Sequence, residues 1–158
     1  MKGFLLAFLF SVSVSPWELP WMNAGSGAIY KSIEHPGVTV VENYFRTCSY
    51  CNENAPNVDE LATKYADNQM VHVLDVGIDR YDRDYQAWVS AHNPNHPVIK
   101  DAQRTLTGQL GTTGYPSTYV LDCNNNVVYK STGVWSENTK AELKNAIDQS
   151  LGICIVPL

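Results

Sequence analysis

Basic residues are scarce in this sequence. Its 158 residues include 11 Lys and Arg against 16 Asp and Glu, which gives a net charge of −5 at pH 7. A nucleic-acid-binding surface needs a basic patch, so this balance argues against one. The glycine-rich phosphate loop of nucleotide-binding proteins and the serine elbow of hydrolases are also absent from the sequence. We therefore expect no nucleic-acid partner.

Long apolar runs are missing as well. The run at 3–14 is shorter than the roughly 20 residues that span a bilayer. Lys2 precedes it and small residues follow it, in the order typical of a secretory signal. We expect a signal peptide and linker over 1–27, with 17–27 as the linker, and no stable membrane span. A buried N-terminal helix or strand is the alternative.

The remainder, 28–158, predicts one α/β domain, because strand-like and helix-like segments alternate along it. Such alternation is typical of a central sheet with helices on both faces. The expected strands are 38–45, 71–78, 97–100, 117–122 and 127–130, and the expected helices are 51–66, 85–91, 102–110 and 137–151.

Two of the four cysteines form the motif Cys48-Ser49-Tyr50-Cys51, between a predicted strand and a predicted helix. The start of a helix carries unpaired N–H groups and partial positive charge, which stabilise a thiolate and lower a cysteine's pKa below about 8.5. We expect Cys48 to be an exposed nucleophile and Cys51, one turn deeper, to resolve the mixed disulfide that Cys48 forms.

Other interpretations of this pair are a structural disulfide, a zinc site and a copper site. A loop this short gives a disulfide little entropic benefit, and zinc needs two more ligands. Cu(I) favours thiolates, so copper delivery is the alternative function. His92 and His96 are four apart, but Pro94 and Pro97 prevent a helix there, and we interpret both as ordinary loop histidines. We expect no metal and no organic cofactor.

The region around the cysteines resembles the active-site helix of the thioredoxin-like superfamily: 45–51 match it, with Pro56 five residues after Cys51. Residues 114–122 resemble the cis-proline strand of that superfamily. The segment 85–114 resembles the extra αβ insertion of its exported TlpA/ResA/DsbE-like branch. The resemblance covers nearly all of 30–151. It implies a thioredoxin fold, with a central mixed sheet flanked by helices and an αβ insertion before the cis-proline strand.

The resemblance also implies roles for residues outside the motif. It places Glu42 as a buried acid that takes the proton from Cys51 during resolution, a catalytic role shared with the two cysteines. Asp75 stands where thioredoxin has a lysine, so it would repel Glu42. The Tyr115–Pro116 bond is expected to be cis and to hold a substrate strand. The expected substrate-contacting residues are Tyr115, Pro116, Ser49, Tyr50 and Trp135, with packing as the alternative for Trp135.

The other two cysteines follow the predicted strand 117–122 and the last predicted helix. In a thioredoxin fold both places lie opposite the active site, so the resemblance implies a structural disulfide between Cys123 and Cys154.

From the cysteine motif, the N-terminal pattern and the resemblance, we expect a monomeric, periplasmic thiol–disulfide oxidoreductase. It would act on cysteine-containing proteins together with a redox partner protein, first as a reductant, with disulfide oxidase or isomerase activity as further alternatives.

Overall fold

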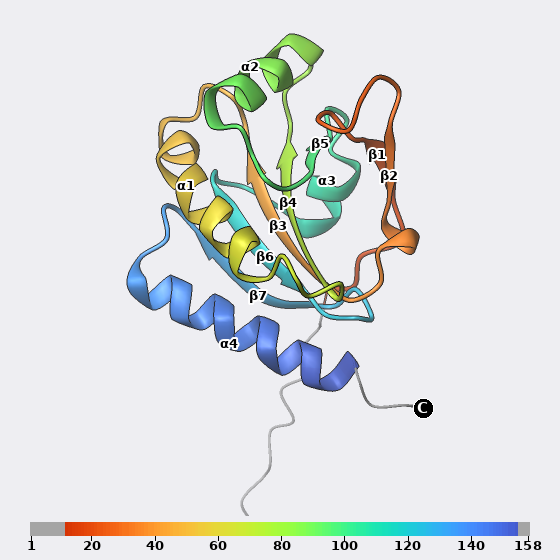
Figure 1. The fold of residues 1–158 in the computed structure, drawn as a ribbon, viewed down its shortest axis with the longest axis vertical. Coiled ribbons are helices and arrows are strands. Elements are labelled where there is room, and N and C mark those ends of the chain that lie inside the picture. Colours follow the sequence, from red (N-terminus) through yellow and green to blue (C-terminus); the bar gives the residue numbers. More distant parts are fainter. Residues whose placement is uncertain (1–11, 155–158) are drawn as a thin grey trace, which may run out of the picture.

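The structure is a computed structural model that describes residues 12–154. Its centre is a five-stranded sheet in the order β5-β4-β3-β6-β7 (Figure 1). Parallel pairing joins β3 to β4 and β4 to β5, whereas β6 runs antiparallel to β3 and β7. The strands are β3 (Val38–Tyr44), β4 (Val71–Gly77), β5 (Val98–Lys100), β6 (Ser117–Leu121) and β7 (Val127–Thr132).

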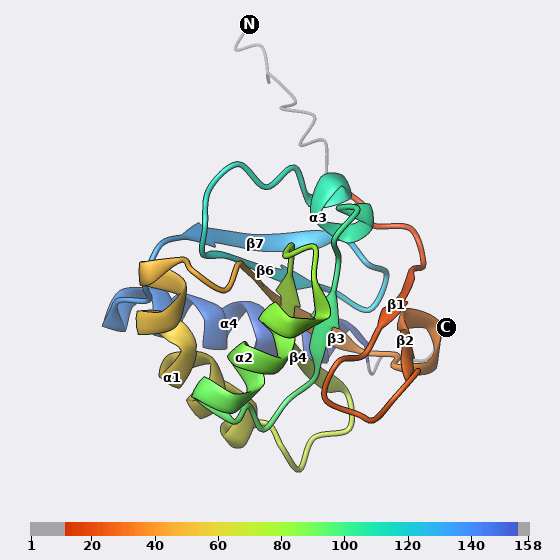
Figure 2. The same ribbon diagram turned by 90° about the horizontal axis from the view of Figure 1, so that it is seen from above.

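Helices cover both faces of this sheet, as Figure 2 shows from above. They are α1 (Ser49–Lys64), α2 (Asp82–His92), α3 (Thr105–Leu110) and α4 (Glu137–Cys154). On one face α1 and α4 bury Val58, Leu61, Leu143 and Ile147 against the valines of β3 and β4. On the other face α3 packs against alternate residues of the same strands. The predicted mixed sheet with helices on both faces is confirmed, and so is the αβ insertion, which consists of α2 and β5.

The segment before the sheet is part of the fold, which corrects the predicted linker over 17–27. Strand β1 (Glu18–Pro20) pairs antiparallel with β2 (Ile29–Lys31). Val14, Trp17 and Leu19 are buried in the same core cluster as α3. The packed structure therefore starts before residue 28. The apolar run 3–14 lies mostly outside the described residues, and a signal peptide stays a prediction.

Helix boundaries differ from expectation at several ends: α2 begins at Asp82 rather than at 85, and α3 begins at Thr105 rather than at 102. Helix α1 begins at Ser49 rather than at Cys51, because Cys48 acts as its N-cap. Helix α4 continues through Gly152 to Cys154, which is tied to Cys123. Among residues 12–154, no helix has both the length and the apolar character needed to cross a membrane.

Candidate active site

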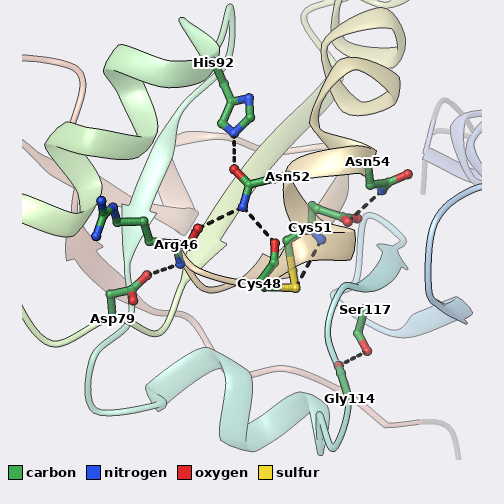
Figure 3. Close-up of a disulfide and its surroundings, with 10 residues drawn as sticks. Arg46, Cys48, Cys51, Asn52, Asn54, Asp79, His92, Gly114 and Ser117 are labelled. Atoms are coloured by element: carbon green, nitrogen blue, oxygen red, sulfur yellow. Dashed lines mark hydrogen bonds between the residues drawn. A yellow bond between two sulfur atoms is a disulfide. The ribbon is translucent and has the colours of Figure 1, made fainter.

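The two cysteines of the motif lie where strand β3 gives way to helix α1. Cys48 is the N-cap of α1, and its Sγ accepts a hydrogen bond from the backbone N–H of Cys51 at 3.1 Å (Figure 3). The pair forms a disulfide with 5.2 Å between the Cα atoms. The helix-end position expected from the sequence is confirmed, so sulfur charge at Cys48 would face unpaired backbone N–H groups.

Cys48 is less accessible than expected. Only 6% of its surface is exposed, and Cys51 is more deeply buried. In the disulfide form, Cys48 is bonded to Cys51 and both belong to an apolar cluster with Tyr44 and Trp88. The prediction of an exposed nucleophile is therefore wrong for this state. The two residues between the cysteines are exposed, with Tyr50 at 64%, so the motif itself reaches the surface.

The loop before β6 lies against the same apolar cluster. The Tyr115–Pro116 peptide bond is cis, Pro116 is buried, and Tyr115 packs on the cluster that contains both cysteines. Ser117 Oγ donates a hydrogen bond to the carbonyl of Gly114 at 2.6 Å (Figure 3), which closes this loop on itself. The structure thus brings the segment predicted to bind substrate next to the cysteine motif.

Glu42 lies in the middle of β3 and is buried beneath α1. Its Oε1 accepts a hydrogen bond from Asn54 Nδ2 at 2.9 Å, and its Oε2 accepts one from the Thr118 hydroxyl at 2.6 Å. Burial raises the pKa of Glu42 to about 8. The two hydrogen bonds oppose that rise, and the charge of Asp75 adds to it. The buried acid implied by the resemblance is therefore present, with a carboxyl that titrates near neutral pH.

Trp135 belongs to the interior and not to an exposed contact surface. Its indole N–H donates to the Thr118 hydroxyl at 2.7 Å, and its backbone N–H donates to Asn54 Oδ1 at 2.9 Å. The side chain is buried, so the packing alternative describes it correctly. Trp135 therefore orients both partners of Glu42. Thr118 had no place in the sequence prediction, although it is the register partner of Glu42 across β3 and β6.

Asp75 is the parallel-strand neighbour of Glu42 and, as expected, repels it. It is also held by His96, whose Nε2 lies 3.1 Å from Asp75 Oδ2 and whose Nδ1 lies 3.2 Å from Asp59 Oδ1. Burial by itself would lower the pKa of His96, but the two carboxylates outweigh that effect and raise it. The interpretation of His96 as an ordinary loop histidine is wrong, because its ring is buried between the buried Asp75 and the half-buried Asp59.

The second cysteine pair lies away from the motif. Strand β6 begins beside Asn43, near the end of β3, and finishes beside Thr39, so Cys123 follows at the opposite end of the sheet. Cys154 is the last residue of α4 and forms a disulfide with Cys123, with 5.6 Å between the Cα atoms. Among residues 12–154, no group of three or more His, Cys, Asp or Glu side chains is arranged to hold a metal ion.

The raised pKa of Glu42 makes folding stability depend on pH. Between about pH 4.5 and pH 8 the folded protein keeps a proton on Glu42 that the unfolded chain has released. The stabilisation that this proton gives the folded state is therefore fully present below about pH 4.5 and is lost above about pH 8. The contribution of Glu42 alone to the free energy of unfolding should fall by roughly 2–4 kcal/mol from pH 5 to pH 8.

The variant Glu42→Gln cannot ionise, so we expect it to lose most of this decline. Denaturant titrations at the two pH values measure the effect. Glu53→Gln, the same change at an exposed position of α1, serves as the control and should follow the wild type. Equal pH dependence in the wild type and Glu42→Gln would contradict the assignment of the titrating proton to Glu42.

Fold and cysteine pair together define a class: this is a thioredoxin-fold protein with the disulfide centre of a thiol–disulfide oxidoreductase. A family model described as Redoxin matches residues 25–147, most of the chain, and the chain belongs to that family. This membership confirms the class of protein that the sequence motifs indicate.

Solved structures give the same fold. A candidate thiol:disulfide interchange protein DsbE from Chlorobium tepidum superposes with a TM-score of 0.76 at 20% identity, covering 90% of this chain and 97% of its own. A secreted disulfide oxidoreductase of Mycobacterium tuberculosis, homologous to E. coli DsbE, gives 0.67 at 18% identity, covering 84% of this chain and 95% of its own. At such identities the likeness concerns the fold.

Among curated proteins, the chain matches the NHL repeat-containing protein 2 of Gallus gallus with 25% identity over 123 residues, which is 73% of this chain. The matched part is 17% of that relative, so the chain corresponds to a small portion of a much longer protein. The other activities of that protein therefore carry no implication for this one.

Proposed function

We propose that this protein reduces disulfide bonds in cysteine-containing proteins outside the cytoplasm, and that Cys48 and Cys51 supply the two electrons. The observation that supports this best is the position of Cys48. Its sulfur caps α1 and receives the N–H of Cys51, so the helix end stabilises the anion that attacks a disulfide.

The reaction runs in two exchanges. The Cys48 thiolate attacks one sulfur of the substrate disulfide, a mixed disulfide forms, and the other substrate sulfur leaves as a thiolate. The Cys51 thiol then loses its proton and attacks Cys48. This step releases the second substrate thiolate and leaves the Cys48–Cys51 disulfide seen in the structure. A redox partner protein that donates two electrons returns the pair to the dithiol.

Glu42 is the proton acceptor for Cys51 in this scheme, acting in those molecules whose Glu42 carboxyl is ionised, a fraction that grows as the pH approaches 8. A carboxyl with a pKa of about 8 is well matched to a thiol whose ordinary pKa is about 8.5, because the proton then moves at little energetic cost. Asn54, one turn beyond Cys51 on α1, donates to Glu42 and links the acid to the active-site helix. The carboxylate keeps both of its hydrogen bonds whenever the proton has left.

The substrate would lie between the motif and the loop before β6. Ser49 and Tyr50 are exposed, and Tyr115 packs against Phe45, which immediately precedes the motif loop, with ring centroids 5.6 Å apart. An extended substrate segment could pair with the backbone beside Pro116 while its disulfide approaches Cys48. The N-terminal sequence pattern, and a secreted relative of the same fold, support a periplasmic location.

The reduction potential of the Cys48–Cys51 pair tests the direction of the reaction. We expect a value close to that of thioredoxin, about −270 mV, as suits a reductant. Equilibration with glutathione or dithiothreitol buffers, followed by trapping of free thiols and mass spectrometry, measures it. A value near about −120 mV would identify an oxidant and contradict the proposed direction while leaving the exchange chemistry intact.

A further inference from the structure

Asn52, the residue after the second cysteine, holds the loop that carries the first. Its side-chain Nδ2 donates to the carbonyl of Arg46 at 2.9 Å and to the carbonyl of Cys48 at 2.8 Å (Figure 3). The Cys48 carbonyl also accepts the backbone N–H of Asn52 at 3.0 Å. Both hydrogens of one amide group therefore fasten the loop to α1.

The orientation of this amide follows from its partners. Two carbonyl oxygens can accept hydrogen bonds only, so the nitrogen of Asn52 must face them and Oδ1 must face the other way. There it meets His92 Nε2 at 2.8 Å, and this nitrogen must then carry a hydrogen and donate. His92 donates in this way in its neutral and its charged form, and it comes from the end of α2, in the inserted segment.

The same loop is held from its other side. The backbone N–H of Arg46 donates to Asp79 Oδ2 at 2.8 Å, and Asp79 lies between β4 and α2 (Figure 3). His92 is packed on Trp88, with ring centroids 4.2 Å apart, and Trp88 is itself buried. Helix α2 and the loop that precedes it therefore hold the segment around Cys48 from two sides.

We propose that Asn52 and His92 are positioning residues that keep the Cys48 sulfur on the helix end once the disulfide opens. In the oxidised form the bond to Cys51 holds that sulfur in place. After reduction the bond is gone, and the placement of Sγ over the Cys51 N–H depends on the backbone of 46–48, which Asn52 fixes. This inference rests on the proposed function. It assigns a role in that function to the inserted helix α2, which helps to stabilise the Cys48 thiolate through His92 and Asn52.

The experiment measures the thiol pKa of Cys48 in the reduced protein, from the pH dependence of its alkylation by iodoacetamide, followed by mass spectrometry. With Asn52→Ala we expect the pKa to rise and alkylation at pH 6 to slow about fivefold, because the loop no longer holds Sγ against the N–H. The reduction potential should become more negative, since the reduced form loses stabilisation. Asn145→Ala, the same change at an exposed position of α4, is the control and should leave both values unchanged.

His92 provides the decisive comparison. His92→Phe keeps a ring against Trp88 and removes the donor, so it should slow alkylation in the same direction. His92→Gln, which keeps an N–H donor, should restore much of the wild-type rate. In the double variant Asn52→Ala/His92→Phe, the histidine change should add nothing to the asparagine change, because His92 acts through Asn52.

Three outcomes would overturn this inference. They are an unchanged Cys48 pKa in Asn52→Ala, additive effects in the double variant, and reduced thermal stability as the only consequence of either change. Each can arise while the wild-type Cys48 thiol remains acidic and active, in which case the proposed function stands. A wild-type Cys48 that reacts no faster than an ordinary cysteine would instead count against the function itself.

Discussion

Replacing Cys48 by serine should lower the rate of protein disulfide reduction at least about 10³-fold. Serine preserves the size of the side chain and can still accept the N–H of Cys51, but a hydroxyl is not ionised near neutral pH and cannot form a mixed disulfide. The fold should persist, because the rest of the helix start is unaltered. Reduction of insulin by the variant, with dithiothreitol as electron source, measures the loss.

Cys51→Ser is the matched variant and should fail differently. It retains the attacking sulfur and lacks the resolving one, so a mixed disulfide between Cys48 and the substrate should accumulate and be visible on a non-reducing gel. Mixed disulfides at residue 51 in the Cys48→Ser protein, or full activity without Cys48, would show that the roles of the two cysteines have been assigned wrongly.

Removing the Cys123–Cys154 disulfide should cost about 3–4 kcal/mol of folding free energy on the chain-entropy model. The two residues are 31 apart, and their link fastens the end of α4 to the turn between β6 and β7. The double variant Cys123→Ser/Cys154→Ser leaves no unpaired thiol and should retain disulfide reductase activity, since the second pair lies at the far end of the sheet.

Chemical denaturation of the double variant and the wild type, with the Cys48–Cys51 pair oxidised in both, measures this cost. Graded reduction of the wild type provides a second test. We expect mild dithiothreitol to open the pair at Cys48 first and strong reductant in denaturant to open the other. A variant as stable as the wild type, or equal ease of reduction of both pairs, would contradict the structural role.

The elements around the active site were the easiest to predict from the sequence. A run of β-branched residues forms the first half of β3, and the cysteine motif follows at the start of a helix. The local sequence pattern and the tertiary structure therefore agree in this region. Residues 17–27 were harder. Their prolines and glycines are typical of a linker, yet Pro20 lies on a short strand and the burial of Trp17 depends on packing with distant segments. Such contacts leave no periodic trace in the sequence.

The contacts of buried polar residues were also hard to predict from the sequence. Glu42 was predicted from the resemblance alone, and the structure buries it in β3 as that resemblance implied. The contacts of His96 and Asn52 were not predicted, because the carboxylates beside His96 come from α1 and β4 and the partner of Asn52 Oδ1 comes from α2. Prolines near His96 indicated a loop, which is correct, but a loop residue can still be buried when carboxylates on α1 and β4 surround it.

The packing of Val14, Trp17 and Leu19 has a consequence for shortened forms of the protein. A polypeptide trimmed to begin at residue 28 would leave Tyr30 without the indole of Trp17, which stacks on it, and would open the core above α3 to water. A form that begins at residue 28 should therefore unfold at a lower denaturant concentration than one that begins at residue 12.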